Sequence, residues 1–417
     1  MVKDVVISQM REAERKLAEA YVPRDVGWPA GNDDMIRVVI GPRRAGKSFM
    51  ALHEMKRTGP FGYLNFDDER LLATNDFDAM IAALVEAWGH PERLLLDEIQ
   101  NVPDWELLVN RLQRQGFRLT LTGSNAHLLS SELATHLTGR HIPIVLFPFS
   151  FREFAASRGG PFTDAEMAEL FRTYVESGGY PEPLMKGLSA RDYLSTLFNS
   201  ILYKDVVVRH GIRIHGAIED VARVLINSCS QRYSNNSLAD ALGGINPRTA
   251  ARYAGYLEEA FLHFPVRRFS FKYAVQAKAP RKAYFIDNGL VTANSMMFSA
   301  NRGALYENAV ACELKAREMA GRIQLFYWQG SDQREVDFVV KEGRQVTSLI
   351  QVCVDPSSPK VFDREARALL KASRETGCTD LLILTDSLSG ETDFSWYGDT
   401  ARIRMLPAWR WLSEKHW

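Results

Sequence analysis

The sequence predicts an α/β protein that begins with a parallel sheet. The apolar segment Ile36–Ile40 is β-branched and continues directly into a glycine-rich segment, Gly41–Ser48, after which a helix is expected. Three further apolar segments, 63–66, 93–96 and 118–121, alternate with helical stretches. Nearly all-apolar strands that alternate with helices are typical of a parallel sheet covered by helices on both faces. Residues 33–158 are therefore expected to form such a layer.

Length and composition limit the remaining possibilities. With 417 residues, the chain is long enough for two or three domains. It carries 51 Lys and Arg against 51 Asp and Glu, so it is not a polycationic DNA coat. Four cysteines without CxxC spacing favour neither a zinc site nor a disulfide framework. Without a signal-peptide core or about 18 consecutive apolar residues, no membrane association is predicted, and the cytoplasm is the expected compartment.

We expect four domains along the chain. Residues 1–160 form the phosphate-binding α/β core, which opens with a helix over residues 1–20. Residues 161–210 form a helical lid that is broken at Ser177–Pro181. Residues 211–282 form a helix-turn-helix domain, and residues 283–417 return to mixed α/β structure.

The glycine-rich segment fits the pattern G-x-x-x-x-G-K-[ST] of a phosphate-binding loop. Its residues are Gly41, Pro42, Arg43, Arg44, Ala45, Gly46, Lys47 and Ser48. The glycines let backbone N–H groups close around phosphates, and the helix N-terminus adds its positive dipole. Lys47 is expected to reach the phosphates as a point charge, and the Ser48 hydroxyl to ligate Mg²⁺. A chance glycine-rich turn is the alternative, but strand, loop and helix all agree with the motif.

A second motif predicts hydrolysis as well as nucleotide binding. The apolar strand 94–96 ends in two carboxylates, Asp97 and Glu98. Open α/β sheets bind ligands at the carboxyl ends of their strands, where Asp97 would orient the Mg²⁺ shell and Glu98 would polarise the attacking water. Two surface acids at a strand end are the structural alternative.

Three more residues are candidates for the same site. Ser124 and Asn125 follow the strand 118–121 and would hydrogen-bond the γ-phosphate or the water, unless they form an ordinary turn with an Asn cap. Arg140, in Leu137–Arg140, would act on a neighbouring chain's γ-phosphate, which requires a dimer or a ring. A surface or intramolecular role for Arg140 is equally compatible with the sequence.

An ordered set of motifs extends over essentially the whole chain. The motifs are GPRRAGKS, YLNFDDERL, LLLDEIQNVPDW, LTGSNAHLL, LTGR, LFPFSFREF, GGYPEPL, YKDVVVRHGI, FIDNGL, LYENAV and YWQGSDQREVDFVV. This set resembles the prokaryotic AAA-type ATPases that carry a restriction-endonuclease-like C-terminal domain. The resemblance implies an ATPase module, a winged-helix segment and a nuclease-like tail, and it implies little about biological role.

The segment 211–282 contains a helix-turn-helix with a basic face. A short helix over Ser237–Leu242, a Gly243-Gly244 turn and a second helix from Asn246 are expected, with residues 264–273 as the wing. Residues 205–282 carry 12 Lys and Arg against 6 Asp and Glu. The candidate DNA contacts are Arg248, Arg252, Arg267, Arg268 and Lys272. Packing of this domain on protein, without DNA contact, is the alternative.

The C-terminal domain is expected to follow the restriction-endonuclease-like order of helix, three strands, helix and strand. Such a core places acids at the positions of Glu307 and Asp337 and an E-x-K pair on the third strand. Here Gln351 and Cys353 replace that pair, so the ammonium is missing. A relocated cation, Lys360 or Arg364, would substitute in part, and a non-cleaving tail is favoured over a nuclease.

These observations predict an ATPase that uses ATP and Mg²⁺ and docks on duplex DNA. The first alternative is a nucleotide-driven switch or scaffold that recruits a protein partner. The second is an ATP-regulated DNA nuclease.

Overall fold

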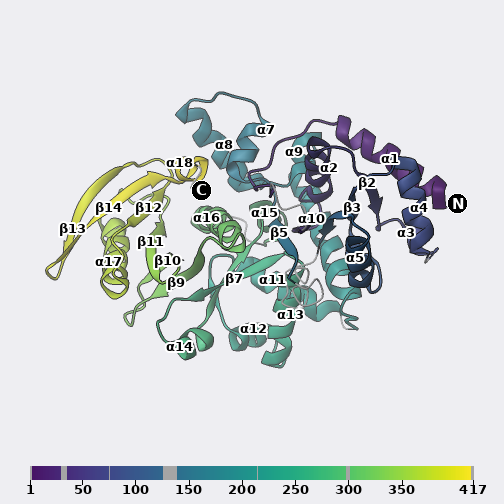
Figure 1. The fold of residues 1–417 in the computed structure, drawn as a ribbon. Coiled ribbons are helices and arrows are strands. Elements are labelled where there is room, and N and C mark those ends of the chain that lie inside the picture. The colour runs from purple at the N-terminus through teal and green to yellow at the C-terminus, as the bar shows by residue number, and fades with distance from the viewer. Residues whose placement is uncertain are drawn as a thin grey trace. The chain divides into compact units, whose positions relative to one another are not determined.

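The computed structural model describes residues 2–29, 35–74, 76–124, 139–213, 215–296 and 301–414. The chain divides into two compact units, Met1–Pro148 and Phe149–Trp417. Figure 1 shows the first unit from purple to blue and the second from teal to yellow. The first unit ends twelve residues before the boundary expected at residue 160.

The first unit is a five-stranded parallel sheet with helices on both faces. Its strand order is β2-β3-β4-β1-β5. The elements are α1 (Val2–Ala18), β1 (Ile36–Ile40), α2 (Lys47–Thr58), β2 (Gly62–Asn65), α3 (Glu69–Leu72), α4 (Phe77–Trp88), β3 (Arg93–Asp97), η1 (Ile99–Asn101), α5 (Trp105–Arg114), β4 (Arg118–Gly123) and β5 (His141–Val145). The α/β class is confirmed, whereas β5 was not expected.

Alternate residues of the central strand explain the two layers of helices. Val38 and Ile40 of β1 belong to a core that includes residues of α1, α4 and α5. Val39 points to the opposite face and belongs to a core with residues of α2. Successive side chains of a strand point to opposite faces, so an all-apolar strand requires cover on both sides.

The second unit opens with helices. They are α7 (Phe151–Ser157), α8 (Asp164–Ser177), α9 (Pro181–Lys186), α10 (Ala190–Ile201) and a π-helical turn, η3 (Leu202–Val208). The expected break after Ser177 is present: Gly178 has a φ of 74°, and Pro181 opens the next helix.

Four helices and three strands follow. They are α11 (His215–Asn227), β6 (Arg232–Tyr233), α12 (Asn235–Ala241), α13 (Pro247–Glu259), β7 (His263–Arg268), α14 (Tyr273–Lys278) and β8 (Arg281–Phe285). The helix pair forms as predicted. Gly243 and Gly244 have positive φ, and the Asn246 side chain caps α13 by accepting from the Arg248 N–H over 2.8 Å.

The bounds expected for the wing, residues 264–273, are wrong. The strand ends at Arg268, and its antiparallel partner is β8, beyond the exposed segment that contains α14. β8 also crosses the domain boundary that we expected at residue 282. The sequence obscured β8 because it begins with two charged residues, Arg281 and Lys282.

The remaining elements extend the same sheet. They are α15 (Asn288–Asn294), α16 (Arg302–Met319), β9 (Gln324–Gln329), β10 (Glu335–Glu342), β11 (Gln345–Val352), α17 (Pro359–Thr376), β12 (Leu381–Thr385), β13 (Gly390–Trp396), β14 (Asp399–Pro407) and α18 (Ala408–Ser413). The nine-stranded mixed sheet has the order β13-β14-β12-β11-β10-β9-β7-β8-β6. β7 joins β9 through Arg267 and Arg268, so the hairpin is built into the C-terminal sheet.

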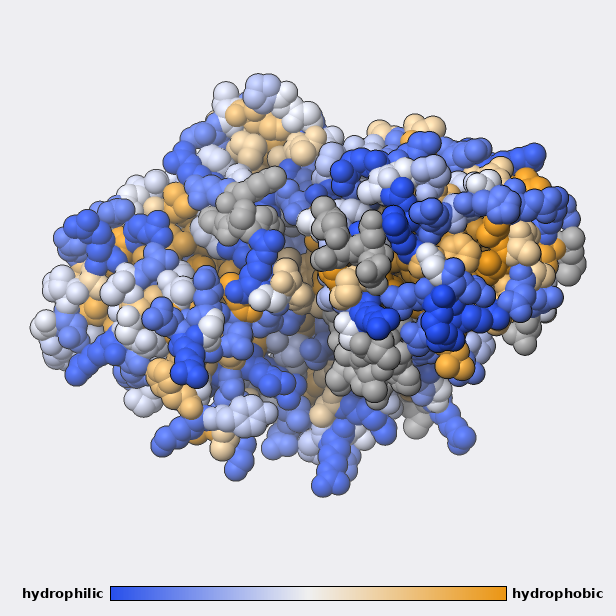
Figure 2. All heavy atoms as spheres, viewed as in Figure 1, coloured by the Kyte–Doolittle hydropathy of each residue, from blue (hydrophilic) through white to orange (hydrophobic). Residues whose placement is uncertain are grey.

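The described helices include none that is long and apolar enough to cross a membrane. On the face shown in Figure 2, hydrophilic side chains predominate and the hydrophobic patches are small.

Candidate functional site

The phosphate-binding loop and the two acids meet at the carboxyl edge of the first sheet. β1 ends at Ile40, β3 at Asp97 and β4 at Gly123, and these three strands are adjacent and parallel. Parallel strands end at the same edge, so residues far apart in sequence converge there. The loop that follows β1 connects directly to α2.

The loop has a backbone that requires glycine. Gly41 has a φ of 155°, and a Cβ placed there would lie 1.9 Å from the Leu146 carbonyl oxygen. Arg44 and Gly46 also have positive φ, and Gly46 immediately precedes Lys47, the first residue of α2. Among the other loop residues, Pro42 and Ala45 are buried, whereas Arg43 is half-buried.

Lys47 closes the loop from within. It is 4% exposed, its Nζ donates to the Pro42 carbonyl over 3.0 Å, and the same Nζ lies 3.7 Å from Glu98 Oε1. A buried ammonium requires partners. Phosphate oxygens would supply stronger, charged acceptors than the Pro42 carbonyl.

Asp97 is fully buried, and its carboxylate accepts hydrogen bonds from several hydroxyl groups. Its Oδ1 accepts from Ser48 Oγ over 2.8 Å and also from Thr122, and its Oδ2 accepts from the Tyr63 hydroxyl over 2.9 Å. Burial, and secondarily the neighbouring charge of Glu98, raise the pKa of Asp97.

Glu98 lies beside Asp97 in a different environment. Its φ is 51°, and its N–H donates to the Thr122 hydroxyl over 3.1 Å. Burial alone would raise the pKa of Glu98, but Lys47, the Gln100 amide, Arg43 and Ser124 together outweigh it and lower the pKa. Gln100 Nε2 donates to Glu98 Oε2 over 2.5 Å. The carboxylate is thus held ionised, as a proton acceptor must be.

Ser124 is the only one of the three additional candidates found beside the acids among the described residues. It is 1% exposed and follows β4, and its hydroxyl lies 3.5 Å from Gln100 Nε2. Asn125 lies outside the described residues. Sequence reasoning missed the contacts of Tyr63, Gln100 and Thr122 with the acids. All three lie in the quoted motifs, but nothing in those motifs indicated that they hold the carboxylates.

Arg140 lies at the other edge of the sheet. It directly precedes β5, and its carbonyl accepts from the Ile36 N–H at the start of β1 over 2.9 Å. A five-residue strand is about 16 Å long, so Arg140 starts a full strand length from the loop of its own chain. Its side chain is exposed.

Arg24, which the sequence analysis overlooked, ties the phosphate-binding loop to the segment after β5. Its Nη1 donates to the Ala45 carbonyl over 2.9 Å, and its Nη2 donates to the Phe147 carbonyl over 2.6 Å. No short motif marks an arginine that contacts backbone, so no local pattern pointed to Arg24.

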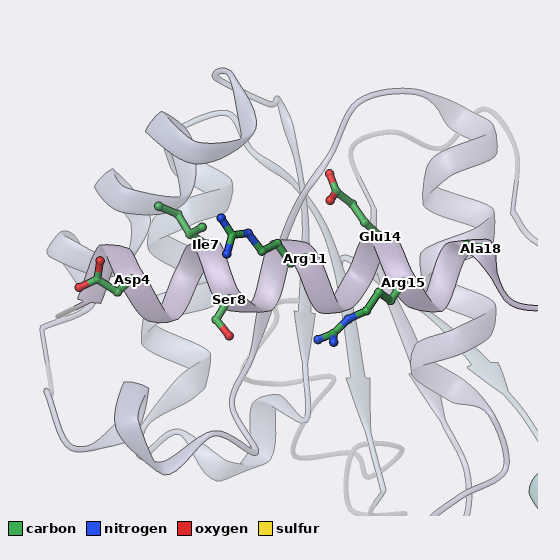
Figure 3. A pocket seen from close by; sticks show the side chains of 7 residues that line it. All are labelled: Asp4, Ile7, Ser8, Arg11, Glu14, Arg15 and Ala18. Atoms are coloured by element: carbon green, nitrogen blue, oxygen red, sulfur yellow. The ribbon is translucent and has the colours of Figure 1, made fainter.

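A surface depression lies along α1, away from these groups. Its lining residues are Asp4, Ile7, Ser8, Arg11, Glu14, Arg15 and Ala18 (Figure 3). Val5, Val6, Gln9 and Ala13 are the buried residues of α1, so the depression follows the outward side of the helix. Its arginines and acids have mixed charge, and it carries no argument for a substrate site.

Most of the basic side chains that are candidates for DNA contact in the second unit are exposed. Arg248 and Arg252 lie one turn apart on α13, and Arg267 and Lys272 are also exposed. Arg268 is half-buried and donates to the Gln329 carbonyl over 2.5 Å. Four of the five candidate side chains are therefore accessible to a ligand.

Glu307 and Asp337 come together as expected, but around a cation that the sequence did not indicate. Lys282 Nζ of β8 lies 2.6 Å from Glu307 Oε1, 2.9 Å from Asp337 Oδ1 and 2.8 Å from Glu335 Oε1. The Lys282 side chain is 2% exposed. The expected substitution by Lys360 or Arg364 is therefore wrong: Arg364 pairs with Glu365, and Lys282 contacts the acids.

The two altered positions of the third strand differ. Gln351 lies on β11, and its Oε1 accepts from the Asp337 N–H over 3.2 Å. Cys353 lies one residue beyond β11, and burial raises its pKa to about 11, so it stays a neutral thiol. Among the described residues, no group of three or more His, Cys, Asp or Glu side chains is arranged to hold a metal ion.

Three family models match successive parts of the chain. An AAA domain model, AAA_14, matches residues 33–155. Two domains of unknown function follow: DUF8612 matches residues 168–301, and DUF4143 matches residues 302–389.

Two relatives and two solved structures are similar to the chain. The uncharacterized protein MJ1544 of Methanocaldococcus jannaschii is 30% identical, with 90% of this chain and 88% of that protein covered. An uncharacterized protein of Haemophilus influenzae is 28% identical, with 75% and 81% covered. The Walker-type ATPase PABY2304 of Pyrococcus abyssi has a TM-score of 0.42 at 14% identity, covering 68% of this chain and 94% of that one. A DNA replication initiation factor has a TM-score of 0.26 at 15% identity, covering 60% and 87%.

The structural scores are too low to carry an argument, whereas the match to the Methanocaldococcus protein extends over nearly all of both chains. The chain belongs to the family of that protein, in which a P-loop AAA domain is joined to two domains of unknown function.

Proposed function

We propose that the chain binds ATP with Mg²⁺ and hydrolyses it, and that its second unit docks the ATPase on duplex DNA. The observation that carries the ATPase proposal is the convergence of Lys47, Ser48, Asp97 and Glu98 at one strand edge. Each belongs to a motif whose spacing predicted its role.

The residues present fit a nucleotide with its metal ion. Ser48 Oγ and Asp97 Oδ1, 2.8 Å apart, are the hard oxygen donors that Mg²⁺ takes, alongside phosphate oxygens and water. The bound ion would supply neutralisation of charge on the phosphates. Lys47 would exchange the Pro42 carbonyl for phosphate oxygens, and Ser124 would hydrogen-bond the terminal phosphate.

Glu98 is the proposed proton acceptor for the attacking water. The contact with Lys47 and the hydrogen bond from Gln100 keep the carboxylate ionised and oriented. On ATP binding, Lys47 would turn towards phosphate, which frees Glu98 Oε1 for water. Gln100 would then be the group that positions Glu98.

An Arg140 that acts on phosphate would have to act on another chain's nucleotide. Its position at the amino end of β5 supports only that arrangement, because its own loop lies at the opposite edge. We therefore propose assembly of a dimer or a ring as the condition for full activity.

The proposal of DNA docking rests on exposed charge. Arg248, Arg252, Arg267 and Lys272 are accessible on a winged helix-turn-helix arrangement, and such side chains would bind backbone phosphates with little sequence preference. The C-terminal part would be a nuclease-like tail that does not cleave, because its acids are already paired with Lys282. Four free cysteines among the described residues fit a reducing, cytoplasmic setting.

A nucleotide-driven switch that recruits a protein partner is the second candidate. The exposed aromatic side chains Phe271 and Tyr273, next to Lys272, favour it, because exposed aromatic groups are common in protein interfaces. An ATP-regulated nuclease is the third, and the paired state of Glu307 and Asp337 argues against it.

ATP turnover separates DNA docking from the protein-partner switch. The measurement is steady-state hydrolysis with and without duplex DNA at about 50 and 200 mM salt. We expect stimulation by DNA that fades at the higher salt. Turnover that is indifferent to DNA would favour the protein-partner switch, and absence of turnover in every condition would contradict the ATPase proposal.

A further inference from the structure

A buried ammonium lies at the centre of the acidic cluster formed by Glu307, Glu335 and Asp337. We propose that Lys282 is the resident cation of this cluster and holds it closed to divalent metal ions. The proposal concerns the second unit and does not depend on ATP hydrolysis or DNA docking.

The first argument is the coordination of the ammonium. Lys282 Nζ has three carboxylate oxygens at 2.6, 2.8 and 2.9 Å, and an ammonium has three protons to donate. Each of the three ammonium protons therefore has one carboxylate oxygen as its acceptor. A magnesium ion would need the same oxygens at about 2.0–2.1 Å and could not share them with the ammonium.

Other donors of the chain engage the second oxygens of Asp337 and Glu335, and Tyr284 shares the Glu307 oxygen that Lys282 contacts. Asp337 Oδ2 accepts from the Val352 N–H over 2.9 Å, and Glu335 Oε2 lies 3.2 Å from Arg232 Nε. Tyr284, two residues after Lys282, donates its hydroxyl to Glu307 Oε1 over 2.5 Å. Gln351, the residue at the altered acid position, accepts a hydrogen bond from the Asp337 N–H.

The backbone of Lys282 is held in place by two neighbouring strands. Its strand, β8, is paired with β7 on one edge and with β6 on the other, where Lys282 lies opposite Arg232. Moving the lysine backbone would break both ladders. The ammonium could therefore leave the acids only through a change of side-chain rotamer that gives up all three carboxylate contacts.

The lysine also explains how the altered third strand is tolerated. Three carboxylates buried together repel one another, and removing their counter-charge would leave the cluster uncompensated. A metal ion supplies that charge in a metal-binding core. Here Lys282 supplies it, so the metal is not needed for folding and metal-dependent cleavage is not expected.

The test is a titration of the nucleotide-free full chain with Mn²⁺. Binding is monitored by the loss of the free Mn²⁺ signal in electron paramagnetic resonance. Lys282→Ala should gain one site that binds at least about tenfold more tightly than any site of the unaltered chain. Adding Glu307→Gln to Lys282→Ala should abolish the gain. Lys315→Ala, which removes a lysine paired with Glu318 on α16, is the matched control and should gain nothing.

If Lys282→Ala folds poorly, measurements of its stability replace the binding titration. A Lys282→Ala chain that is unfolded in chelator should refold in millimolar Mn²⁺. A chain carrying Lys282→Met, Glu307→Gln and Glu335→Gln should fold without metal. The proposal is overturned if the unaltered chain binds Mn²⁺ through Glu307. It is also overturned if Lys282→Ala, folded or not, fails to respond to Mn²⁺.

Discussion

Ser48 Oγ donates a hydrogen bond to Asp97 Oδ1 over 2.8 Å, which joins the two motifs of the proposed ATP site across 49 positions of sequence. The bond orients the hydroxyl and one carboxylate oxygen towards the same place. Tyr63 and Thr122 hold the same carboxylate from other strands. The pair is therefore organised before any nucleotide arrives, as a site that binds a metal–nucleotide complex requires.

Replacing Gly41 by alanine should damage the loop through a backbone clash. The new Cβ would lie 1.9 Å from the Leu146 carbonyl oxygen, so the strand and the segment after β5 must separate. We expect ATP affinity to fall by at least about tenfold in a binding titration. Gly89→Ala is the control: its φ is 72° and no atom lies within 4 Å, so it should cost about 1 kcal/mol of stability and leave ATP affinity intact. Equal ATP affinities for the two variants would contradict the role of Gly41.

Arg24→Ala should weaken ATP binding more than the chemical step. The side chain supports the loop through the Ala45 and Phe147 carbonyls and does not belong to the catalytic residues. We expect KM for ATP to rise several-fold while kcat changes less. Arg15→Ala, an exposed position on α1, should leave both constants unchanged. A fall in kcat alone would show that Arg24 does not act through the loop.

The buried His263 should make the stability of the second unit depend on pH. Burial lowers its pKa to about 4, whereas an unfolded histidine has a pKa near 6.5. The unfolded chain therefore binds more protons between these values, and stability should fall by about 3 kcal/mol as pH falls from 7 to 4. His263→Gln, which can still hydrogen-bond the Tyr233 hydroxyl, should remove this loss, and His215→Gln at an exposed site should not. Parallel pH profiles for the unaltered chain and His263→Gln in urea unfolding would refute the assignment.

Reversing the charge of Arg248 and Arg252 should weaken duplex DNA binding. Both are exposed on α13, and each phosphate contact contributes to the salt dependence of the affinity. Arg248→Glu with Arg252→Glu should lower affinity at least about tenfold and flatten the slope of affinity against salt, measured by fluorescence anisotropy. Arg223→Glu on α11 is the exposed control. Unchanged DNA binding by the double variant would show that Arg248 and Arg252 do not contact the DNA.

The convergence of the proposed ATP-site residues could be predicted because each of their motifs lies in one continuous segment. Lys47, Ser48, Asp97 and Glu98 stand directly after apolar strands, and the parallel sheet brings those strand ends together. The contacts of Tyr63 and Arg24 could not be predicted, since their partners are distant in sequence. Gln100 lies only two residues from Glu98, but no local pattern indicated that its amide turns back to that carboxylate. The same holds for β5, whose residues His141–Val145 include a proline and read as a loop.

In the second unit, the order of helices and strands around Glu307 and Asp337 could be predicted, but the identity of the cation could not. Lys282 lies 25 residues before Glu307, at the start of a strand that was expected to end a different domain. Only the pairing of β8 with β7 and β6 brings its ammonium to the acids. Long-range strand pairing of this kind leaves no local pattern in a sequence.

The most direct test of the ATPase proposal is ATP hydrolysis by Glu98→Gln, with ATP binding measured on the same protein. The account predicts that binding persists while turnover falls by about 10²- to 10⁴-fold, because the amide cannot accept the proton of the attacking water. Glu92→Gln, an exposed position just before β3, should hydrolyse ATP like the unaltered chain. Turnover by Glu98→Gln at the rate of the unaltered chain would contradict the account.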